Sequence, residues 1–128
     1  ICPQDSYAFV GRVDYTDVPK YLAEIDVFVN PSLTESFGVA VLEASSTGCA
    51  VIASRAGGLP EVVQEEKTGL LCKPDDTPDL TECMSRMVMH PEMRERMGRA
   101  GTSFVQSEYD WEKCLQQMIQ HYQEIQRT

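Results

Sequence analysis

The sequence predicts an α/β fold, in which a Rossmann-like parallel sheet is flanked by helices and followed by further helices at the C-terminus. Short apolar runs alternate with helical segments up to residue 76, an order typical of a parallel, doubly wound sheet. Beyond residue 76 the hydrophobic pattern is helical throughout. The length of 128 residues suits one core, so we expect a single domain over 1–128.

Four short runs are predicted to be strands, because each is rich in β-branched, aromatic or aliphatic residues and is bounded by turn signals. They are Tyr7 to Val13, Val27 to Val29, Ala50 to Ala53 and Gly69 to Cys72. Asn30-Pro31 ends the second of these runs, since proline cannot donate to a strand ladder.

Helices are predicted between and after these strands. Pro19 and Pro60 each mark the first turn of a helix, and Gly48 suits the position just past the end of a helix. The expected helices cover residues 17–25, 36–47 and 59–64, then 77–90, 91–107 and 111–126. The last helix carries one apolar stripe: Trp111, Leu115, Met118, Ile119, Tyr122 and Ile125. We interpret that stripe as core packing rather than as a membrane face, because its polar side lacks the Lys and Arg content of a membrane-surface helix.

Charge and cysteine content exclude several functions. A net charge of −9 disfavours nucleic acid and anionic membranes as partners, and any phosphate site must be local. No apolar run approaches the roughly 18 residues of a membrane span, and no signal peptide is visible. The 5 cysteines lack C-x-x-C spacing, which favours free thiols in a reducing cytosol. We see no metal site, and Asp75-Asp76 is interpreted as a helix cap.

The stretch from Pro31 to Glu43 is the most informative part of the chain. A polar turn with one glycine leads from the strand into a helix, which is how an open α/β sheet presents a backbone-lined anion site. Glu35 and Glu43 bracket the helix start. A helical path between them would be about 12 Å long, enough for one carboxylate to meet a sugar and the other a ribose, with a diphosphate between them.

This stretch resembles the C-terminal, donor-binding domain of the retaining GT-B glycosyltransferases of group 1, of the family-four type. The family signature, PS-x-x-ESFG-x-x-x-LEA, stands here as Pro31-Ser32, Glu35-Ser36-Phe37-Gly38 and Leu42-Glu43-Ala44. Gly48-x-x-Val51, Gly57-Gly58-Leu59-Pro60-Glu61 and Thr68-Gly69-Leu70-Leu71 follow in the expected order. The resemblance extends more weakly from Phe9 to Trp111. It implies that upstream strands and a whole acceptor domain precede this chain in the full protein.

The resemblance gives Glu35 the catalytic role. The matching family residue contacts the donor sugar near the reacting carbon, where a carboxylate stabilises the positive charge of an oxocarbenium-like transition state. Without the resemblance, Glu35 could simply be a carboxylate that interacts with a helix dipole.

Donor binding is expected from the turn and the helix start. The backbone N–H groups of Ser36, Phe37, Gly38 and Val39 would hold the diphosphate, with Gly38 leaving room for the ligand. The alternative is a simple capped helix with Phe37 in the core. The family residue that matches Glu43 accepts the ribose hydroxyls, whereas a helix-surface glutamate is the alternative for this position.

Four further residues are candidates for the base or sugar pocket. Ser32 and Thr34 precede Glu35, and Gly57 and Gly58 form a turn at the carboxyl end of a strand, where α/β sheets hold ligands. A tight turn without a binding role explains the two glycines equally well.

We therefore expect the donor-binding part of an enzyme that transfers sugar from a nucleotide-sugar to an acceptor hydroxyl with retention. The fragment alone would be inactive, and the resemblance implies no cofactor and no essential metal. The acceptor, a glycan, a lipid or a small molecule, would bind through the upstream domain. We expect a cytoplasmic protein, or one peripheral at the inner membrane. The alternatives are a non-catalytic module that binds nucleotide-sugar or protein, and another GT-B-type enzyme such as a phosphorylase or an epimerase.

Overall fold

A computed structural model describes residues 3–127 and contains one parallel sheet. Its strands are β1 (Val27–Asn30), β2 (Ala50–Ser54) and β3 (Gly69–Cys72), hydrogen-bonded in the order β1-β2-β3. Phe28 lies opposite Val51, and Ile52 lies opposite Leu70. All strands point the same way, so their carboxyl ends meet at one edge of the sheet. The predicted Rossmann-like α/β class is confirmed.

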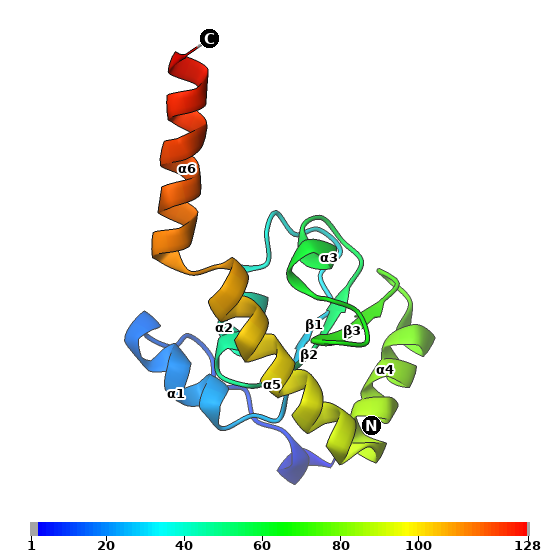
Figure 1. The fold of residues 1–128 in the computed structure, drawn as a ribbon. Helices are drawn as coiled ribbons and strands as arrows, with labels where there is room; N and C mark the ends of the chain where they lie inside the picture. The colour runs from blue at the N-terminus through cyan, green and yellow to red at the C-terminus, as the bar shows by residue number, and fades with distance from the viewer. Residues whose placement is uncertain (1–2, 128) are drawn as a thin grey trace.

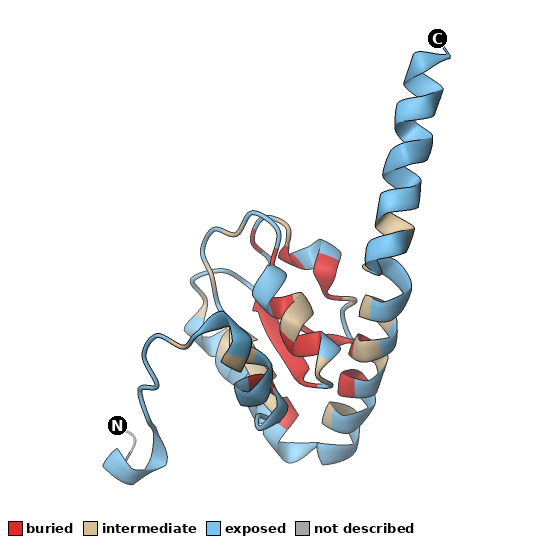
Figure 2. Ribbon diagram, turned by 90° about the vertical axis from the view of Figure 1, so that its left-hand side faces the viewer, coloured by how far each residue is buried: buried red, intermediate tan, exposed pale blue. Residues whose placement is uncertain are grey.

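Helices cover both faces of this sheet (Figure 1). On one face lie α1 (Val18–Ala23), α2 (Val39–Ser46) and α3 (Leu59–Val62); on the other lie α4 (Thr77–Met89) and α5 (Pro91–Glu108). The side chains of β2 alternate between the two layers: Val51 and Ala53 pack with α1 to α3, while Ala50 and Ile52 pack with α4 and α5. All residues of β2 and β3 are buried, and Figure 2 shows this buried part of the sheet between the helices. Two 3₁₀ turns, Gln4–Ser6 and Tyr15–Asp17, precede α1.

Local sequence explains the ends of these helices. The carboxylate of Asp76 accepts a hydrogen bond from the N–H of Asp79 and so caps α4, while Asp110 caps α6 (Trp111–Gln126) through the N–H of Lys113. Gly48 follows α2 with φ of 88°, the left-handed conformation that terminates many helices. The predicted cap at Asp76 and the predicted helix stop at Gly48 are confirmed.

The predicted strand at Tyr7 to Val13 is wrong. That segment is irregular, and Phe9 is 94% exposed. A strand needs a neighbour that pairs its N–H and C=O groups. Within residues 3–127, β1 is hydrogen-bonded only to β2, and no described strand lies along its other edge. Over residues 3–127 this segment pairs with no strand, so its apolar residues stay outside the sheet.

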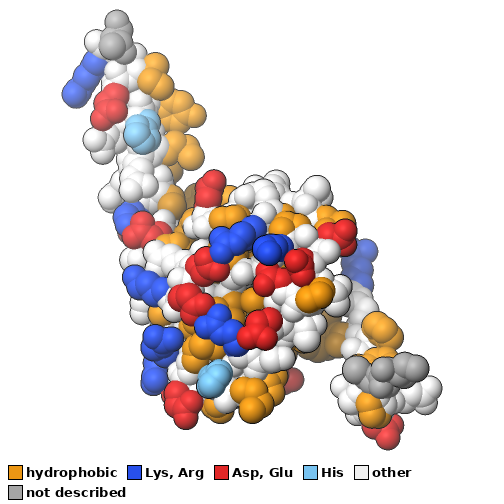
Figure 3. Space-filling view, turned by 90° about the vertical axis from the view of Figure 1, so that its right-hand side faces the viewer, with side chains coloured by type: hydrophobic (Ala, Val, Ile, Leu, Met, Phe, Trp, Pro, Cys, Tyr) orange, Lys and Arg blue, Asp and Glu red, His pale blue; other side chains and the backbone are white. Residues whose placement is uncertain are grey.

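Two helix predictions also need correction. Helix α2 begins at Val39 rather than at residue 36, because Gly38 adopts φ of 97° and cannot be part of the helix. The apolar stripe of α6 is not core packing: no described residue of α6 is buried, and the helix projects from the body of the molecule (Figure 2). Figure 3 shows the hydrophobic side chains along one side of the projecting helix.

None of the helices described over residues 3–127 is long and apolar enough to cross a membrane. Among the described residues, Cys49, Cys72, Cys83 and Cys114 are free thiols, while Cys2 lies outside the described part. The described residues contain no group of three His, Cys, Asp or Glu side chains arranged to hold a metal ion.

Candidate functional site

Two loops meet at the carboxyl edge of the sheet. The first is the Glu35 loop, residues 31–38, which joins β1 to α2; the second is the glycine turn, Gly57-Gly58, which joins β2 to α3. The N–H of Gly58 donates to the main-chain oxygen of Glu35 at 3.2 Å. A Cβ on Gly57 would lie 1.6 Å from that same oxygen, and one on Gly58 would lie 2.7 Å from the carbonyl oxygen of Ser36. Both glycines are required by this close approach.

The carboxylate of Glu35 is held by its own loop. Glu35 is half-buried, and its Oε1 accepts a hydrogen bond from the N–H of Ser36 at 3.0 Å. Since Glu35 lies before α2 begins, the path between Glu35 and Glu43 is not helical over its first half, so a helical rise does not give their separation. Thr34 and Ser36, its neighbours in the loop, are exposed.

Ser32 anchors the Glu35 loop to the sheet. Its N–H donates to Oδ1 of Asn30 at 3.2 Å, and its carbonyl oxygen accepts a hydrogen bond from the hydroxyl of Ser54 at the end of β2. Ser54 is buried, with 1% of its surface exposed. These contacts give Ser32 a structural role in the Glu35 loop, and this role does not depend on any contact with a ligand.

Gly38 is required by packing as well as by its backbone conformation. A Cβ at this position would lie 2.9 Å from side-chain atoms of both Leu59 and Val62 on α3. The space that we expected a ligand to use at Gly38 is therefore occupied by α3. The first N–H groups of α2, at Val39 and Ala40, have no carbonyl within the helix to accept them, and the helix dipole favours an anion at this end.

Glu43 lines a cavity of about 260 Å³ between α1 and α2. The other wall of this cavity comes from the segment around α1, with Tyr15, Pro19 and Leu22 among its residues. Glu43 is half-buried there. A carboxylate beside an apolar and aromatic wall suits a ligand that combines hydroxyl groups with a flat apolar part.

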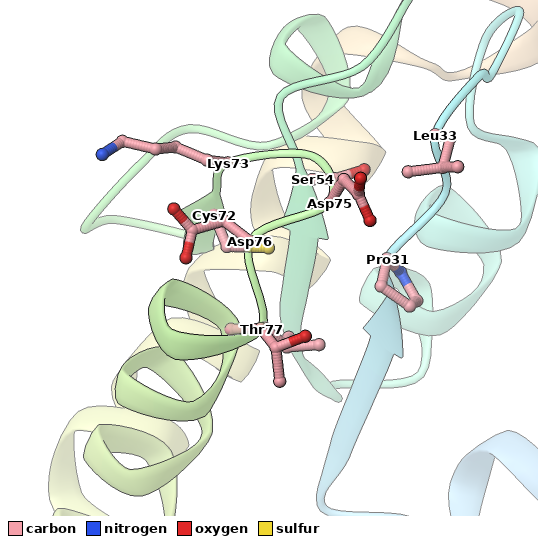
Figure 4. A pocket seen from close by; sticks show the side chains of 9 residues that line it. Pro31, Leu33, Ser54, Cys72, Lys73, Asp75, Asp76 and Thr77 are labelled. Atoms are coloured by element: carbon pink, nitrogen blue, oxygen red, sulfur yellow. The ribbon is translucent and has the colours of Figure 1, made fainter.

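A second hollow lies where all three strands end (Figure 4). Its walls include Pro31 and Leu33 of the Glu35 loop, Ser54, and the segment after β3 with Asp75 and Thr77. Lys73 points outward from it. None of the predicted site residues lines this hollow, which is smaller than the cavity at Glu43, about 170 Å³ against about 260 Å³.

Arg55, directly after β2, forms an ion pair with Glu65, so its charge is already compensated.

The signature from Pro31 to Ala44 gave no indication that Tyr109 lies near the site. The structure places Tyr109 against the Glu35 loop. Its ring meets the edge of Phe37, with 6.0 Å between ring centroids, and its hydroxyl donates to the carbonyl oxygen of Glu61 at 3.3 Å. Phe37 is 42% exposed, so it lies outside the core. The sequence places Tyr109 at a helix boundary but carries no signal for a contact with a loop so far away in the chain.

The parallel sheet with helices on both faces places this chain in the Rossmann-like class of α/β domains. The family model for glycosyl transferases group 1 matches residues 3–104. The chain therefore belongs to the group 1 glycosyltransferase family, as the sequence motif indicates.

Known proteins of this family resemble the chain over most of its length. The sulfoquinovosyl transferase SQD2 of Arabidopsis thaliana is 39% identical over 106 residues, which are 80% of this chain and 21% of that protein. A GDP-mannose-dependent monoacylated alpha-(1-6)-phosphatidylinositol monomannoside mannosyltransferase of Corynebacterium glutamicum is 37% identical over 81% of this chain and 29% of its own length.

A solved structure agrees in fold. The sucrose-phosphate synthase from Thermosynechococcus elongatus superimposes with a TM-score of 0.87 and 36% identity, over 95% of this chain and 31% of that one. The chain thus spans less than a third of the length of these three proteins.

Proposed function

We propose that this chain is the donor-binding part of a glycosyltransferase that moves a sugar from a nucleotide-diphosphate sugar to an acceptor hydroxyl, with retention at the transferred carbon. The observation that carries the proposal is the placement of two carboxylates about the start of α2: Glu35 in the preceding loop and Glu43 within the helix. The first N–H groups of α2, at Val39 and Ala40, lie between these two residues in the sequence and can donate to an anion at the helix start.

Glu35 is proposed as the catalytic carboxylate. Its position is fixed twice, through its Oε1 to the N–H of Ser36 and through its main-chain oxygen to Gly58. A carboxylate fixed before the reaction stabilises developing positive charge on a sugar ring without having to reorganise.

The start of α2 is proposed to bind the diphosphate. Val39 is exposed, so a ligand can reach the first turn of the helix, and Ser36 and Phe37 lie in the loop just before it. Gly38 serves this site by allowing the sharp entry into α2 and the packing of α3. With Arg55 already paired to Glu65, we propose that cations from outside this chain complete the phosphate site.

Glu43 and its cavity are proposed to bind the nucleoside. The carboxylate would accept hydrogen bonds from ribose hydroxyls, and the wall with Tyr15, Pro19 and Leu22 would face the base. Ser32, Thr34, Gly57 and Gly58 would then shape the loops rather than bind directly, since two of them are glycines fixed by backbone contact and Ser32 is tied to Asn30.

The names of the relatives support this proposal. Both curated relatives are named as sugar transferases, and one is named as dependent on GDP-mannose, which is a nucleotide sugar. The acceptor would be bound by the part of the protein outside this chain, so this part alone would be inactive. The absence of an essential metal and the cytoplasmic setting stay predictions from the sequence.

The test uses the full-length protein with UDP-, GDP- and ADP-sugars, measuring binding by calorimetry and transfer by product formation. Glu35→Gln is expected to cut turnover by about 100-fold while nucleotide binding and the melting temperature change little. Glu43→Ala is expected to weaken nucleotide binding by about 10-fold or more, because hydrogen bonds to a charged group are lost. Glu112→Gln, at an exposed position on α6, is the matched control.

Three results would contradict parts of the proposal. Unchanged turnover in Glu35→Gln would remove its catalytic role, and equal affinity in Glu43→Ala would remove the ribose contact. Nucleotide-sugar binding without any transfer in the wild-type full-length protein would favour the alternative of a non-catalytic binding module.

A further inference from the structure

Tyr109 lies at the junction between the last two helices. It ends α5, where its N–H donates to the carbonyl oxygen of Val105 at 2.9 Å, and the next residue, Asp110, caps α6. The position of its ring is therefore fixed by α5, which packs on the sheet through the buried Met97.

The ring of Tyr109 lies between two phenylalanines. The ring of Phe104, one turn earlier in α5, lies 5.6 Å away at 77°, and the ring of Phe37 in the Glu35 loop lies 6.0 Å away at 70°. Both are edge-to-face contacts, an arrangement that aromatic rings prefer because the edge of one ring is positive and the face of the other is negative. Through Phe104 and Tyr109, α5 supports the Glu35 loop from outside the sheet.

The hydroxyl of Tyr109 reaches α3, the helix that follows the second loop of the site. It donates to the carbonyl oxygen of Glu61 in α3, the helix that starts directly after the glycine turn. Burial raises the pKa of the Tyr109 phenol, so the group stays protonated and able to donate at neutral pH. One side chain thus contacts both the Glu35 loop and the helix that follows the glycine turn.

We propose that Tyr109 is a positioning residue for the donor site, which holds the Glu35 loop through Phe37 while its hydroxyl holds α3. This inference rests on the proposed function, because it assumes that the loop binds the donor. Phe37 is one residue from Gly38, where φ of 97° gives the chain a sharp turn into α2. Ser36 and Phe37, just before this turn, are exposed, so the ring of Tyr109 adds a support to this part of the loop from outside the sheet.

The test measures the dissociation constants of UDP, GDP and ADP for the full-length protein, using the diphosphate that saturates the wild type. Tyr109→Leu is expected to weaken binding by about 3- to 10-fold, as for the loss of an aromatic pair. Tyr109→Phe keeps both ring contacts and is expected to bind within about threefold of the wild type. Tyr122→Leu, the same substitution at an exposed position on α6, is expected to leave binding unchanged.

A double-mutant cycle separates positioning from a general loss of stability. If Tyr109 acts through Phe37, Tyr109→Leu should weaken binding no further once Phe37→Leu is present. The inference would be overturned if Tyr109→Leu bound the diphosphate as tightly as the wild type. It would also be overturned if Tyr109→Leu weakened binding as much in the Phe37→Leu background as it does in the wild type. A wild-type protein that binds none of the three diphosphates would instead defeat the proposed function, and this inference with it.

Discussion

The main-chain oxygen of Glu35 accepts a hydrogen bond from the N–H of Gly58, with 3.2 Å between nitrogen and oxygen. This bond joins two loops that α2 and β2 separate in the sequence. It is possible only because neither residue of the glycine turn carries a Cβ, since the space that a side chain would need is filled by the backbone of residues 35–37.

Gly57→Ala should therefore be among the most damaging single substitutions at this edge of the sheet. The added Cβ would lie 1.6 Å from the Glu35 oxygen, and φ of 51° at this position is unfavourable for alanine. We expect a loss of about 3 kcal/mol or more in the free energy of unfolding, measured by urea denaturation. Gly11→Ala is the matched control, because Gly11 also has positive φ but has nothing within 4 Å of the added Cβ.

The control should cost only the backbone strain, about 1–2 kcal/mol. Equal losses in the two variants would mean that the contact with Glu35 adds nothing to the strain and that the two loops do not meet as described.

Much of the fold could be predicted because its signals are local. The strands β2 and β3 are apolar runs between turn residues, and Asp76 and Gly48 mark helix ends by their own chemistry. The segment from Tyr7 to Val13 carries the same kind of local signal but forms no strand, because strand pairing depends on a neighbour. Sequence periodicity reports which residues are apolar, but not whether a partner lies beside them.

The positions of Glu35 and Glu43 were predictable to a similar extent, while their roles toward a ligand stay predictions. The spacing of Glu35 and Glu43 marks two carboxylates near one helix start, and the structure keeps both there. The reason for Gly38 could not be predicted, since it depends on the packing of Leu59 and Val62 from another helix. The contact between Tyr109 and Phe37 could not be predicted either, because it depends on the position in space of the end of α5.

Low pH should weaken the ion pair between Arg86 on α4 and Glu66. Arg86 on α4 binds Glu66 through two hydrogen bonds, of 2.7 and 2.8 Å, and this contact holds the pKa of Glu66 below its usual value. A lowered carboxyl pKa stabilises the fold above the usual carboxyl pKa of about 4.3, and the effect is lost as the pH falls through the lowered value. Because both side chains are partly exposed, we expect this ion pair to contribute under about 1 kcal/mol to the free energy of unfolding.

Urea denaturation of Arg86→Met and the wild type at pH 7 and about pH 2.5 would measure this effect. The deficit of Arg86→Met should be larger at pH 7 than in acid. Arg99→Met removes the more exposed pair with Glu95 and should show a smaller difference between the two conditions. A deficit in Arg86→Met that does not change with pH would assign its effect to packing alone.

The thiols of Cys72 and Cys83 should be unreactive in the folded protein. Both are buried, and burial raises the pKa of each thiol, which lowers the thiolate fraction at neutral pH. Alkylation with iodoacetamide at pH 7.5, followed by peptide mass spectrometry, should label both cysteines only after urea is added. Cys114 on α6 is half-buried and should be labelled in the native state. Labelling of Cys72 as fast as Cys114 would contradict this burial.

Helix α6 should contribute little to the stability of the domain in isolation. None of its described residues is buried, and its apolar stripe is exposed, from 43% at Leu115 to 77% at Trp111. Truncation of the chain after Asp110 should therefore change the free energy of unfolding by less than about 1 kcal/mol, because little apolar surface returns to water. It should also reduce self-association, since an exposed apolar stripe favours contact between molecules.

Thermal denaturation and sedimentation velocity of the two lengths would measure both effects. Truncation before Pro91 is the contrasting case, because it removes α5 with the fully buried Met97 and should unfold the domain. If truncation after Asp110 lowered the melting temperature as strongly as this deeper truncation, then α6 would have to pack on the domain in solution, and its projecting position would be wrong.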